Sequence, residues 1–319
     1  MSAISNLATT ASTPVWGDHL REVARPRQIT VLWRALRADK LALGAAVVLL
    51  LLVIVAIFAP AIAPYDPAAQ SLSLRNDPPM TRPAPDAFPY VLGADALGRD
   101  QLSRLIFGAR VSLAVGGASV LISGLIGTAL GLIAGYYRGT TDDVIMRLVD
   151  VWMGFPSLLL ALVVLYVIGS GFWNVVFVLA ITRWMVYARV TRGLVLSYRE
   201  NVFVEAARAV GCRDREVIVR HLLPNLLSPI LVLATLETAT IILIEASLSF
   251  LGLGLPISIP SWGLMLAQGR QYVTTAWWLV TFPGLAILLT ALSLNLLATW
   301  ARTVSDPAQR WRFATARAK

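Results

Sequence analysis

Long apolar stretches are the feature that most constrains what this chain can fold into. Residues 41–63 contain no charged side chain, and a helix needs only about 20 apolar residues to cross a bilayer. Hydrophobic residues make up 57% of the 319 positions and charged residues 14%, outside the range of ordinary soluble domains. Five further apolar stretches cover about residues 111–136, 151–169, 172–190, 229–251 and 277–300. Because only helices or closed barrels satisfy the backbone in lipid, we predict an all-α polytopic membrane protein with six transmembrane helices.

The first apolar stretch could also be read as a signal peptide, because Ala-Ile-Ala at 61–63 resembles a cleavage site. A leader of that kind would have an unusually long front end and a hydrophobic region longer than the usual ~7–15 residues. Pro64 would also directly follow the cut. We therefore expect residues 41–63 to be a retained helix.

The distribution of basic residues predicts the orientation in the membrane. With the N-terminus inside, residues 1–40, 137–150, 183–228 and 301–319 are cytoplasmic and hold 21 Arg plus Lys, whereas the outer segments 64–110 and 252–276 hold 6. Short loops rich in Arg and Lys stay in the cytoplasm. We therefore expect both termini to be cytoplasmic in a plasma or inner membrane, and we attribute the net charge of +9 to topology rather than to nucleic-acid binding.

The outer segment 64–110 is the longest insertion between apolar stretches. Its first part, through Pro89, is rich in Pro and should be mostly irregular. Asp100 can cap a helix that continues into the second span. Leu102, Leu105, Ile106 and Ala109 would form its apolar stripe.

A polar and basic segment between the fourth and fifth spans predicts a short helical hairpin. Residues 202–210 favour a helix with the small residues Ala206, Ala207 and Ala209, and Gly211 would end it in the left-handed conformation. Asp214 would cap a second helix with Ile218 on its apolar side and a Glu216–Arg220 pair, and Pro224 would stop that helix before the fifth span. We interpret the segment as a rigid lever; an ordinary amphipathic loop is the alternative.

The fifth span contains two ionisable residues. Glu237 lies near its middle and Glu245 toward the outer third. Charged groups facing lipid cost ~2.5–3.5 kcal/mol or more, so both should face the helix bundle or a water-filled path. At 3.6 residues per turn, an arc of about 120° holds Glu237, Thr238, Glu245 and Ser249, which makes these residues a candidate pathway or gate. Hydrogen bonding between helices is an equal alternative for Glu245.

Motifs for catalysis and nucleotide binding are missing from the sequence. A P-loop needs a Lys after its Gly-rich turn, and the two lysines, Lys40 and Lys319, are in no such context. Cys212 is the single cysteine, and His19 and His221 cannot form a metal cluster. We therefore predict no catalytic residue, no metal site, no cofactor held by this chain and no ATP site of its own, and we expect His221 to face a partner or a neighbouring helix.

A series of short motifs in a fixed order identifies a family. It begins with Leu-Gly-x-Asp-x-x-Gly-Arg-Asp-x-x-Ser-Arg at residues 92–104 and includes Glu-Ala-Ala at 205–207 within a longer match over 205–229. Other members of the series are Met146, Arg147, Asp150, Phe155, Pro156, Tyr187, Arg189, Arg192, residues 245–254, Pro260, Trp262, Gly263, residues 282–284, Asn295, Asp306 and Pro307. Over about residues 30–310 the chain resembles the permease subunits of dipeptide and oligopeptide ABC importers of the DppC/OppC type.

This resemblance implies a type I ABC importer permease architecture. The implied parts are a cytoplasmic basic segment 1–40, a first transmembrane helix 41–63, an extracytoplasmic insertion 64–110, a permease core 111–301 and a cytoplasmic tail 302–319, with a cytoplasmic coupling loop 197–228 and an outer loop 252–276. The ATPase-coupling residues would be Glu205, Ala206, Ala207, Ala209, Gly211, Asp214, Ile218, His221, Leu223 and Pro224. Candidate outer loop contacts are Asp95, Arg99, Asp100 and Trp262.

The resemblance also implies partners and a mechanism. The partners would be a second permease subunit, two ATPase subunits or one fused ATPase, and an extracytoplasmic substrate-binding protein, with ATP and Mg²⁺ bound by the ATPases. Transport would proceed by alternating access, driven through the loop around Glu205. Peptides are the main substrate prediction, with nickel chelates, glutathione or haem as alternatives. An ATP-independent transporter or channel, or an exporter permease, fits the motif series poorly.

The chain departs from the family pattern at three places. Arg183 stands where a small or polar residue is usual, so the fourth span could end early or Arg183 could reach the membrane interface. Arg213 replaces a common capping residue, and Pro256 and Pro260 are separated where a Pro pair is frequent. None of these positions belongs to the coupling residues.

Overall fold

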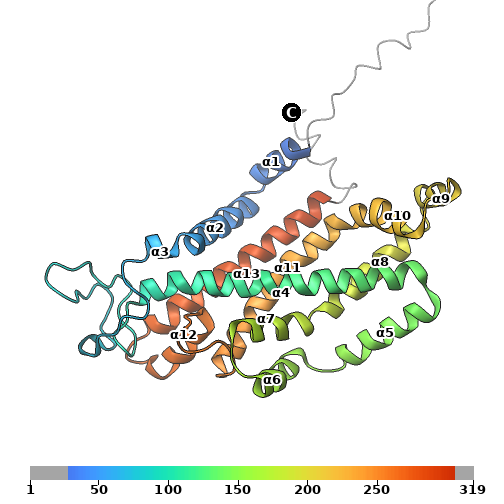
Figure 1. The fold of residues 1–319 in the computed structure, drawn as a ribbon. Helices are drawn as coiled ribbons and strands as arrows, with labels where there is room; N and C mark the ends of the chain where they lie inside the picture. Colours follow the sequence, from blue (N-terminus) through green and yellow to red (C-terminus); the bar gives the residue numbers. More distant parts are fainter. Residues whose placement is uncertain (1–27, 306–319) are drawn as a thin grey trace, which may run out of the picture.

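The computed structural model describes residues 28–305, which form an elongated bundle of helices (Figure 1). The prediction of an all-α fold is confirmed for this part of the chain. The helices are α1 (Gln28–Ala38), α2 (Lys40–Ile57), α3 (Ala59–Ile62), η1 (Leu72–Leu74), α4 (Gln101–Tyr137), α5 (Gly139–Met153), α6 (Ser157–Ile168), α7 (Phe172–Ile181), α8 (Trp184–Tyr198), α9 (Val202–Ala209), α10 (Asp214–Glu216), η2 (Val217–Leu222), α11 (Leu223–Phe250), α12 (Trp262–Gly269), η3 (Arg270–Tyr272) and α13 (Trp278–Ser305).

Four helical segments of the described chain are long and apolar enough to cross a membrane: Lys40–Ile57, Gln101–Tyr137, Asp214–Phe250 and Trp278–Ser305. A fifth span is possible if α5 and α6, which meet at an angle of 84°, count as one. The predicted number of six is therefore not established. The bend falls at Gly154 and Pro156, and proline disfavours helical geometry in the residue before it.

The predicted span 172–190 is broken in the structure, because α7 ends at Ile181 and α8 begins at Trp184. The Thr182 hydroxyl donates to the carbonyl oxygens of Val178 and Leu179 at 3.0 and 3.1 Å. Arg183 follows with non-helical dihedral angles. The early end of this helix, one of the two outcomes expected for Arg183, is confirmed.

Helices α4 and α8 pack closely through a row of glycines on α4. A Cβ atom added at Gly127 would lie 2.1 Å from the Trp184 carbonyl oxygen, and one at Gly131 would lie 2.5 Å from the Ala188 carbonyl oxygen. Small residues spaced by four allow this approach in membranes, where van der Waals packing replaces the hydrophobic effect as the force between helices.

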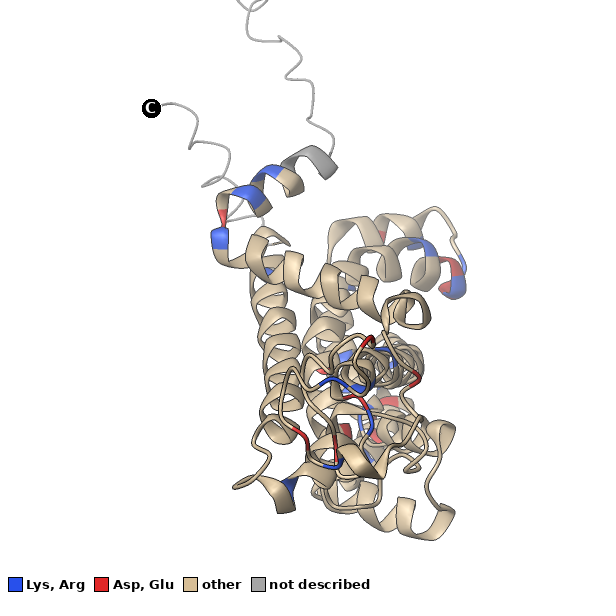
Figure 2. Ribbon diagram, turned by 90° about the vertical axis from the view of Figure 1, so that its left-hand side faces the viewer, with Lys and Arg blue, Asp and Glu red and all other residues tan. Residues whose placement is uncertain are grey.

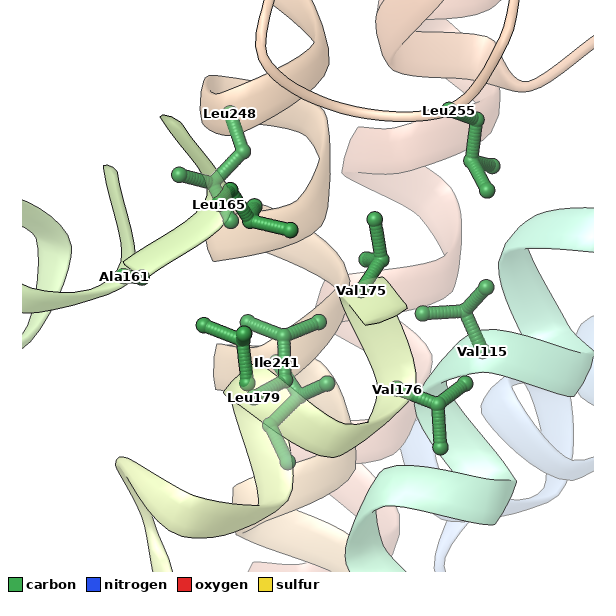
Figure 3. Packing of buried hydrophobic residues seen from close by; sticks show 10 residues of the cluster. Val115, Ala161, Leu165, Val175, Val176, Leu179, Ile241, Leu248 and Leu255 are labelled. Carbon is green, nitrogen blue, oxygen red and sulfur yellow. The ribbon is translucent and has the colours of Figure 1, made fainter. Parts of the chain in front are cut away.

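An apolar cluster joins four helices of the bundle. Figure 3 shows Val115 of α4, Leu165 of α6, Val175 of α7 and Ile241 of α11 turned into a shared interior. All four side chains are at most 1% exposed. This cluster holds α6 and α7 against the long helices despite their short length.

The outer segment between α3 and α4 is irregular apart from η1 and two isolated bridges, as expected from its prolines. Asp100 caps α4 as predicted: its Oδ2 accepts hydrogen bonds from the Ser103 backbone N at 2.8 Å and from Ser103 Oγ at 2.6 Å. Burial raises the pKa of Asp100, although these hydrogen bonds act against the rise. The Trp278 indole donates to the Ala94 carbonyl oxygen at 3.2 Å and ties the segment to α13.

Charged residues gather at the ends of the bundle. Figure 2 shows them near α1, around α9 and α10 and in the outer segment, while most of the ribbon carries none. The long helices instead expose large apolar side chains, among them Leu121, Leu125, Leu231 and Leu288. Such a surface suits a lipid environment or contact with other apolar helices.

Candidate functional site

The segment between α8 and α11 forms the predicted helical hairpin. Helix α9 spans Val202–Ala209, and Gly211 adopts a φ of +84°. The Cys212 backbone N donates to the Ala207 carbonyl oxygen at 3.1 Å and closes the turn. A residue with a side chain is strained at this φ, so Gly211 sets the place where α9 ends. The expected helix and its glycine stop are confirmed.

Helix α9 has one face packed on its own chain and one face exposed. Val204 and Ala207 are 0% and 6% exposed and pack in a cluster with Val217 and Leu222. The opposite face exposes Val202 at 79%, followed by Ala206 and Ala209. Ala207, expected among the ATPase-coupling residues, is thus buried against its own chain while Ala206 is exposed, because neighbouring residues on a helix point about 100° apart.

The exposed face of α9 has the composition of a docking surface. Val202, Ala206 and Ala209 are spaced at i, i+4 and i+7 on one stripe, and Val210, at 80% exposure, extends it. Glu205, next to this stripe, is also exposed. We call Val202, Glu205, Ala206, Ala209 and Val210 the α9 face. A small apolar stripe with one carboxylate can enter a cleft in another protein.

The second arm of the hairpin differs from the prediction in its cap. Arg213, not Asp214, occupies the N-cap position of α10, and its backbone N donates to Glu216 Oε2 at 3.2 Å. The Asp214 carboxylate instead accepts from the Tyr136 hydroxyl at 2.6 Å. Tyr136 lies 78 residues away at the end of α4, so local sequence could not reveal this partner.

The prediction that Pro224 stops this arm is wrong. The chain is helical without a break from Asp214 to Phe250, and Val217–Leu222 is a π-helix. The Leu223 backbone N donates to the Ile218 carbonyl oxygen, five residues back. Proline in a helix lacks an N–H and clashes with the carbonyl four residues earlier, and the wider π turn accommodates it at the start of α11. His221 is half-buried, and its carbonyl oxygen accepts from Asn225 Nδ2 at 2.6 Å.

Arginines link α9 to the end of α4, and the end of α8 to α4 and α5. Arg199 Nη1 donates to the Tyr136 carbonyl oxygen at 2.7 Å, and the Arg208 guanidinium lies 5.0 Å from the centre of the Tyr136 ring. Arg192 Nη2 donates to Asp142 Oδ2 at 2.6 Å, and this carboxylate raises the pKa of Arg192. The hairpin therefore rests on the end of α4 through Arg208 and Asp214, and α4 is itself linked to α8.

Three of the four candidate pathway residues, Glu237, Glu245 and Ser249, are buried within this chain, and Thr238 is half-buried. Glu237, 6% exposed, accepts two hydrogen bonds from the Arg183 guanidinium: Nε to Oε2 at 2.7 Å and Nη2 to Oε1 at 2.8 Å. Glu245, 1% exposed, accepts from Ser249 Oγ at 2.9 Å and from Ser112 Oγ at 3.3 Å. Thr238 donates to the Ala234 carbonyl oxygen within α11. The geometry favours the alternative of hydrogen bonding between helices for Glu245, and it joins Glu237 to an arginine that sequence reasoning left without a partner.

The outer candidates are also buried. Asp95, Arg99, Asp100 and Trp262 are each at most 6% exposed. Arg99 Nε lies 2.7 Å from Asp95 Oδ2, and the Trp262 indole donates to the Leu105 carbonyl oxygen at 3.1 Å. Two residues of the same cluster, Arg104 and Gln268, were missed. Arg104 stands in the quoted motif of residues 92–104, so a search of that motif for unpaired charges could have found it.

In residues 28–305, no three His, Cys, Asp or Glu side chains are grouped so that they could hold a metal ion. Cys212 is half-buried.

Comparison with known proteins places this geometry in context. Residues 127–311 match the family model of the "binding-protein-dependent transport system inner membrane component", and residues 28–79 match the "N-terminal TM domain of oligopeptide transport permease C". The chain is 42% identical over 282 residues to the di/tripeptide transport system permease protein DppC of Pseudomonas aeruginosa, covering 88% of this chain and 93% of that protein. It is 43% identical over 279 residues to the glutathione transport system permease protein GsiD of Escherichia coli, and 40% identical over 276 residues to that of Pectobacterium atrosepticum, with 86% of this chain and 89% of each relative covered.

Proposed function

The chain belongs to the family of binding-protein-dependent transport system inner membrane components, and from this membership we propose that it is a permease subunit of an ATP-driven importer of di- and oligopeptides. Relatives named for di/tripeptide and for glutathione transport cover most of the chain. Glutathione is itself a tripeptide, so both names point to substrates with a peptide bond and free carboxylates. Glutathione is therefore the second candidate substrate.

The observation that carries the mechanism is the α9 face. It is exposed, apolar and small, and it sits on a hairpin that rests on the end of α4 through Arg208 and Asp214. We assign this face to a cleft in an ATPase subunit, which binds ATP and Mg²⁺. The buried side of α9 packs on Val217 and Leu222, and these lead without a helical break into α11. Movement of the ATPase would thus reach the membrane through one continuous helix and drive alternating access.

A second permease subunit would cover an apolar groove on the bundle. The groove has a volume of about 540 Å³ and lies between α4, α8 and α11. Leu121, Leu125 and Leu231 on its walls are 62%, 65% and 64% exposed. Helices of a partner that fill this groove would complete the membrane pathway, with the extracytoplasmic binding protein docking at the opposite end from α9. In this arrangement both termini are cytoplasmic.

The test of the lever is Ala206→Asp. A carboxylate placed on the α9 face would be desolvated in the ATPase cleft without a partner, at a cost of about 3–5 kcal/mol, which weakens association roughly 10²- to 5 × 10³-fold. The permease should stay in the membrane with unchanged thermal stability, because Ala206 touches solvent in the isolated chain. ATPase subunits should no longer co-purify, and import should fall to background.

Two matched variants make the test specific. Ala206→Ser keeps the small volume and should retain both assembly and import. Ala207→Asp puts the same charge into the cluster with Val217 and should lower the amount of folded permease instead. A reconstituted Ala206→Asp complex that imports peptide and stimulates ATP hydrolysis at the normal rate would show that the α9 face is not the docking surface.

A further inference from the structure

A small polar cavity lies at the outer end of the bundle. It has a volume of about 150 Å³ and is bounded by the outer segment, the first turn of α4 and the end of α12. Its wall contains two guanidinium groups, one carboxylate and three carboxamides, from Arg99, Arg104, Asp95, Gln101, Gln268 and Gln271. Arg104 is 2% exposed and Arg99 is 6% exposed, so bulk water solvates neither guanidinium group well.

The two side-chain acceptors that contact the guanidinium groups, Asp95 and Gln268, are already engaged. Asp95 Oδ1 accepts from the backbone N of Leu97 at 2.8 Å and of Arg99 at 3.0 Å. Asp95 Oδ2 contacts Arg99 Nε at 2.7 Å and Arg104 Nε at 3.4 Å. Gln268 Oε1 accepts from both guanidiniums, at 3.3 Å from Arg99 and 2.9 Å from Arg104.

Donors, by contrast, are in excess. Each guanidinium carries five N–H donors, whereas Asp95 Oδ2 and Gln268 Oε1 are the two side-chain acceptors that contact them. Arg104 Nε is buried and has no hydrogen bond within the described chain. Unpaired donors on a buried charged group are costly. The two guanidinium groups therefore have N–H donors left over for a further negatively charged acceptor besides Asp95.

The side chains of the cavity wall also carry a net positive charge. The wall holds two arginines against Asp95 as its single carboxylate. Asp100, the other acid of this stretch, is outside the wall and binds Ser103. The first turn of α4, at the positive end of a 37-residue helix, also lines the cavity.

We propose that this outer cavity is a carboxylate-binding site, in which Arg99 and Arg104 hold the carboxylate between them. Guanidinium groups bind carboxylates with two parallel hydrogen bonds, and the cavity has room for a carboxylate on a short stem. The site does not depend on the proposed transport function, because it follows from the donors, acceptors and volume of this chain alone.

The direct test uses acetate as the probe and acetamide as its neutral control. The full-length chain, in lipid nanodiscs at constant ionic strength, is titrated with each compound, and binding is followed by calorimetry and by the shift of the unfolding temperature. Acetate should bind and raise the unfolding temperature, and acetamide should do neither. Equal responses to the two compounds, or none to acetate, would overturn the proposal.

Some substitutions should weaken acetate binding and another should strengthen it, so the test does not depend on a single variant. Arg104→Gln and Arg99→Gln should weaken acetate binding at least tenfold. Asp95→Asn keeps an oxygen for the backbone of residues 97 and 99 but removes the competing charge, and it should strengthen acetate binding. Arg82→Gln, at an exposed arginine of the same outer segment, should change nothing. If Arg104→Gln fails to fold, unchanged or weaker acetate binding by Asp95→Asn still contradicts the proposal.

Experiments on the assembled transporter would then identify the source of the carboxylate. Weaker docking of the substrate-free binding protein to the Arg104→Gln complex would indicate an acidic side chain of that protein. Unchanged docking, with loss of the preference for peptides with free over amidated C-termini, would indicate the substrate. Both outcomes support the site. Acetate binding would survive even if the chain served another transport function, so the two proposals can fail separately.

Discussion

We predict that removing either Arg183 or Glu237 alone destabilises the protein, whereas replacing both with apolar residues leaves its stability nearly unchanged. The two side chains are 16% and 8% exposed and share two short hydrogen bonds between the α7–α8 break and α11. Removing one partner leaves a buried charge without compensation, which costs about 3–5 kcal/mol. Replacing both by apolar residues of similar size removes the Coulomb attraction and the desolvation cost together.

Three variants close a double-mutant cycle. Arg183→Met and Glu237→Met should each lower the free energy of unfolding by about 3–5 kcal/mol. The double variant should lie within about 1 kcal/mol of the wild type, so that the two positions couple by at least about 5 kcal/mol. Equilibrium unfolding of the full-length chain in mixed detergent micelles measures all four states under one condition.

Additive losses in the double variant would refute this reasoning. They would mean that Arg183 and Glu237 are each stabilised by groups other than the partner that the structure assigns. A double variant that is stable but inactive in transport would retain the energetic account and would add a role for the charges in the pathway, which was the original expectation for Glu237.

Two further predictions concern packing and topology. Gly131→Val should destabilise the bundle by about 1–3 kcal/mol or more through overpacking, because an added Cβ would meet the Ala188 carbonyl oxygen at 2.5 Å. The matched control is Gly193→Val on α8, where nothing lies within 4 Å of an added Cβ. Equal unfolding curves for the two variants would contradict the close α4–α8 contact. A cysteine at Leu72, which is 70% exposed, should react with an impermeant thiol reagent from outside, and native Cys212 only after permeabilisation; the reverse pattern would invert the orientation inferred from the arginine distribution.

Much of the candidate coupling loop could be read from local sequence. Helix α9, its end at Gly211 and the Asp100 cap of α4 all depend on residues within four positions of one another. Backbone propensity and capping act over this range. The local sequence did not reveal that Ala207 is buried, because Val217 and Leu222, which cover it, reach it only after the hairpin folds back.

In the membrane spans, too, the local sequence predicted some features and tertiary contacts decided others. Apolar length predicted the helices around α2, α4, α11 and α13, since the bilayer imposes its thickness on any chain that crosses it. The break before Arg183 and the helical path through Pro224 were decided by contacts. Arg183 meets a carboxylate 54 residues away, and a π turn makes space for the proline ring.

Sequence alone therefore determined that this chain is a helical membrane protein of a transport family, because composition, apolar length and motif order are properties of residues close together in the chain. The tertiary structure decided which charges are paired, which face of α9 is free and that Arg99 and Arg104 line one cavity. Those outcomes depend on the distance and burial of groups from separate helices. The free energy of a charge changes by several kcal/mol with its partner and its exposure to water, and neither is written in the local sequence.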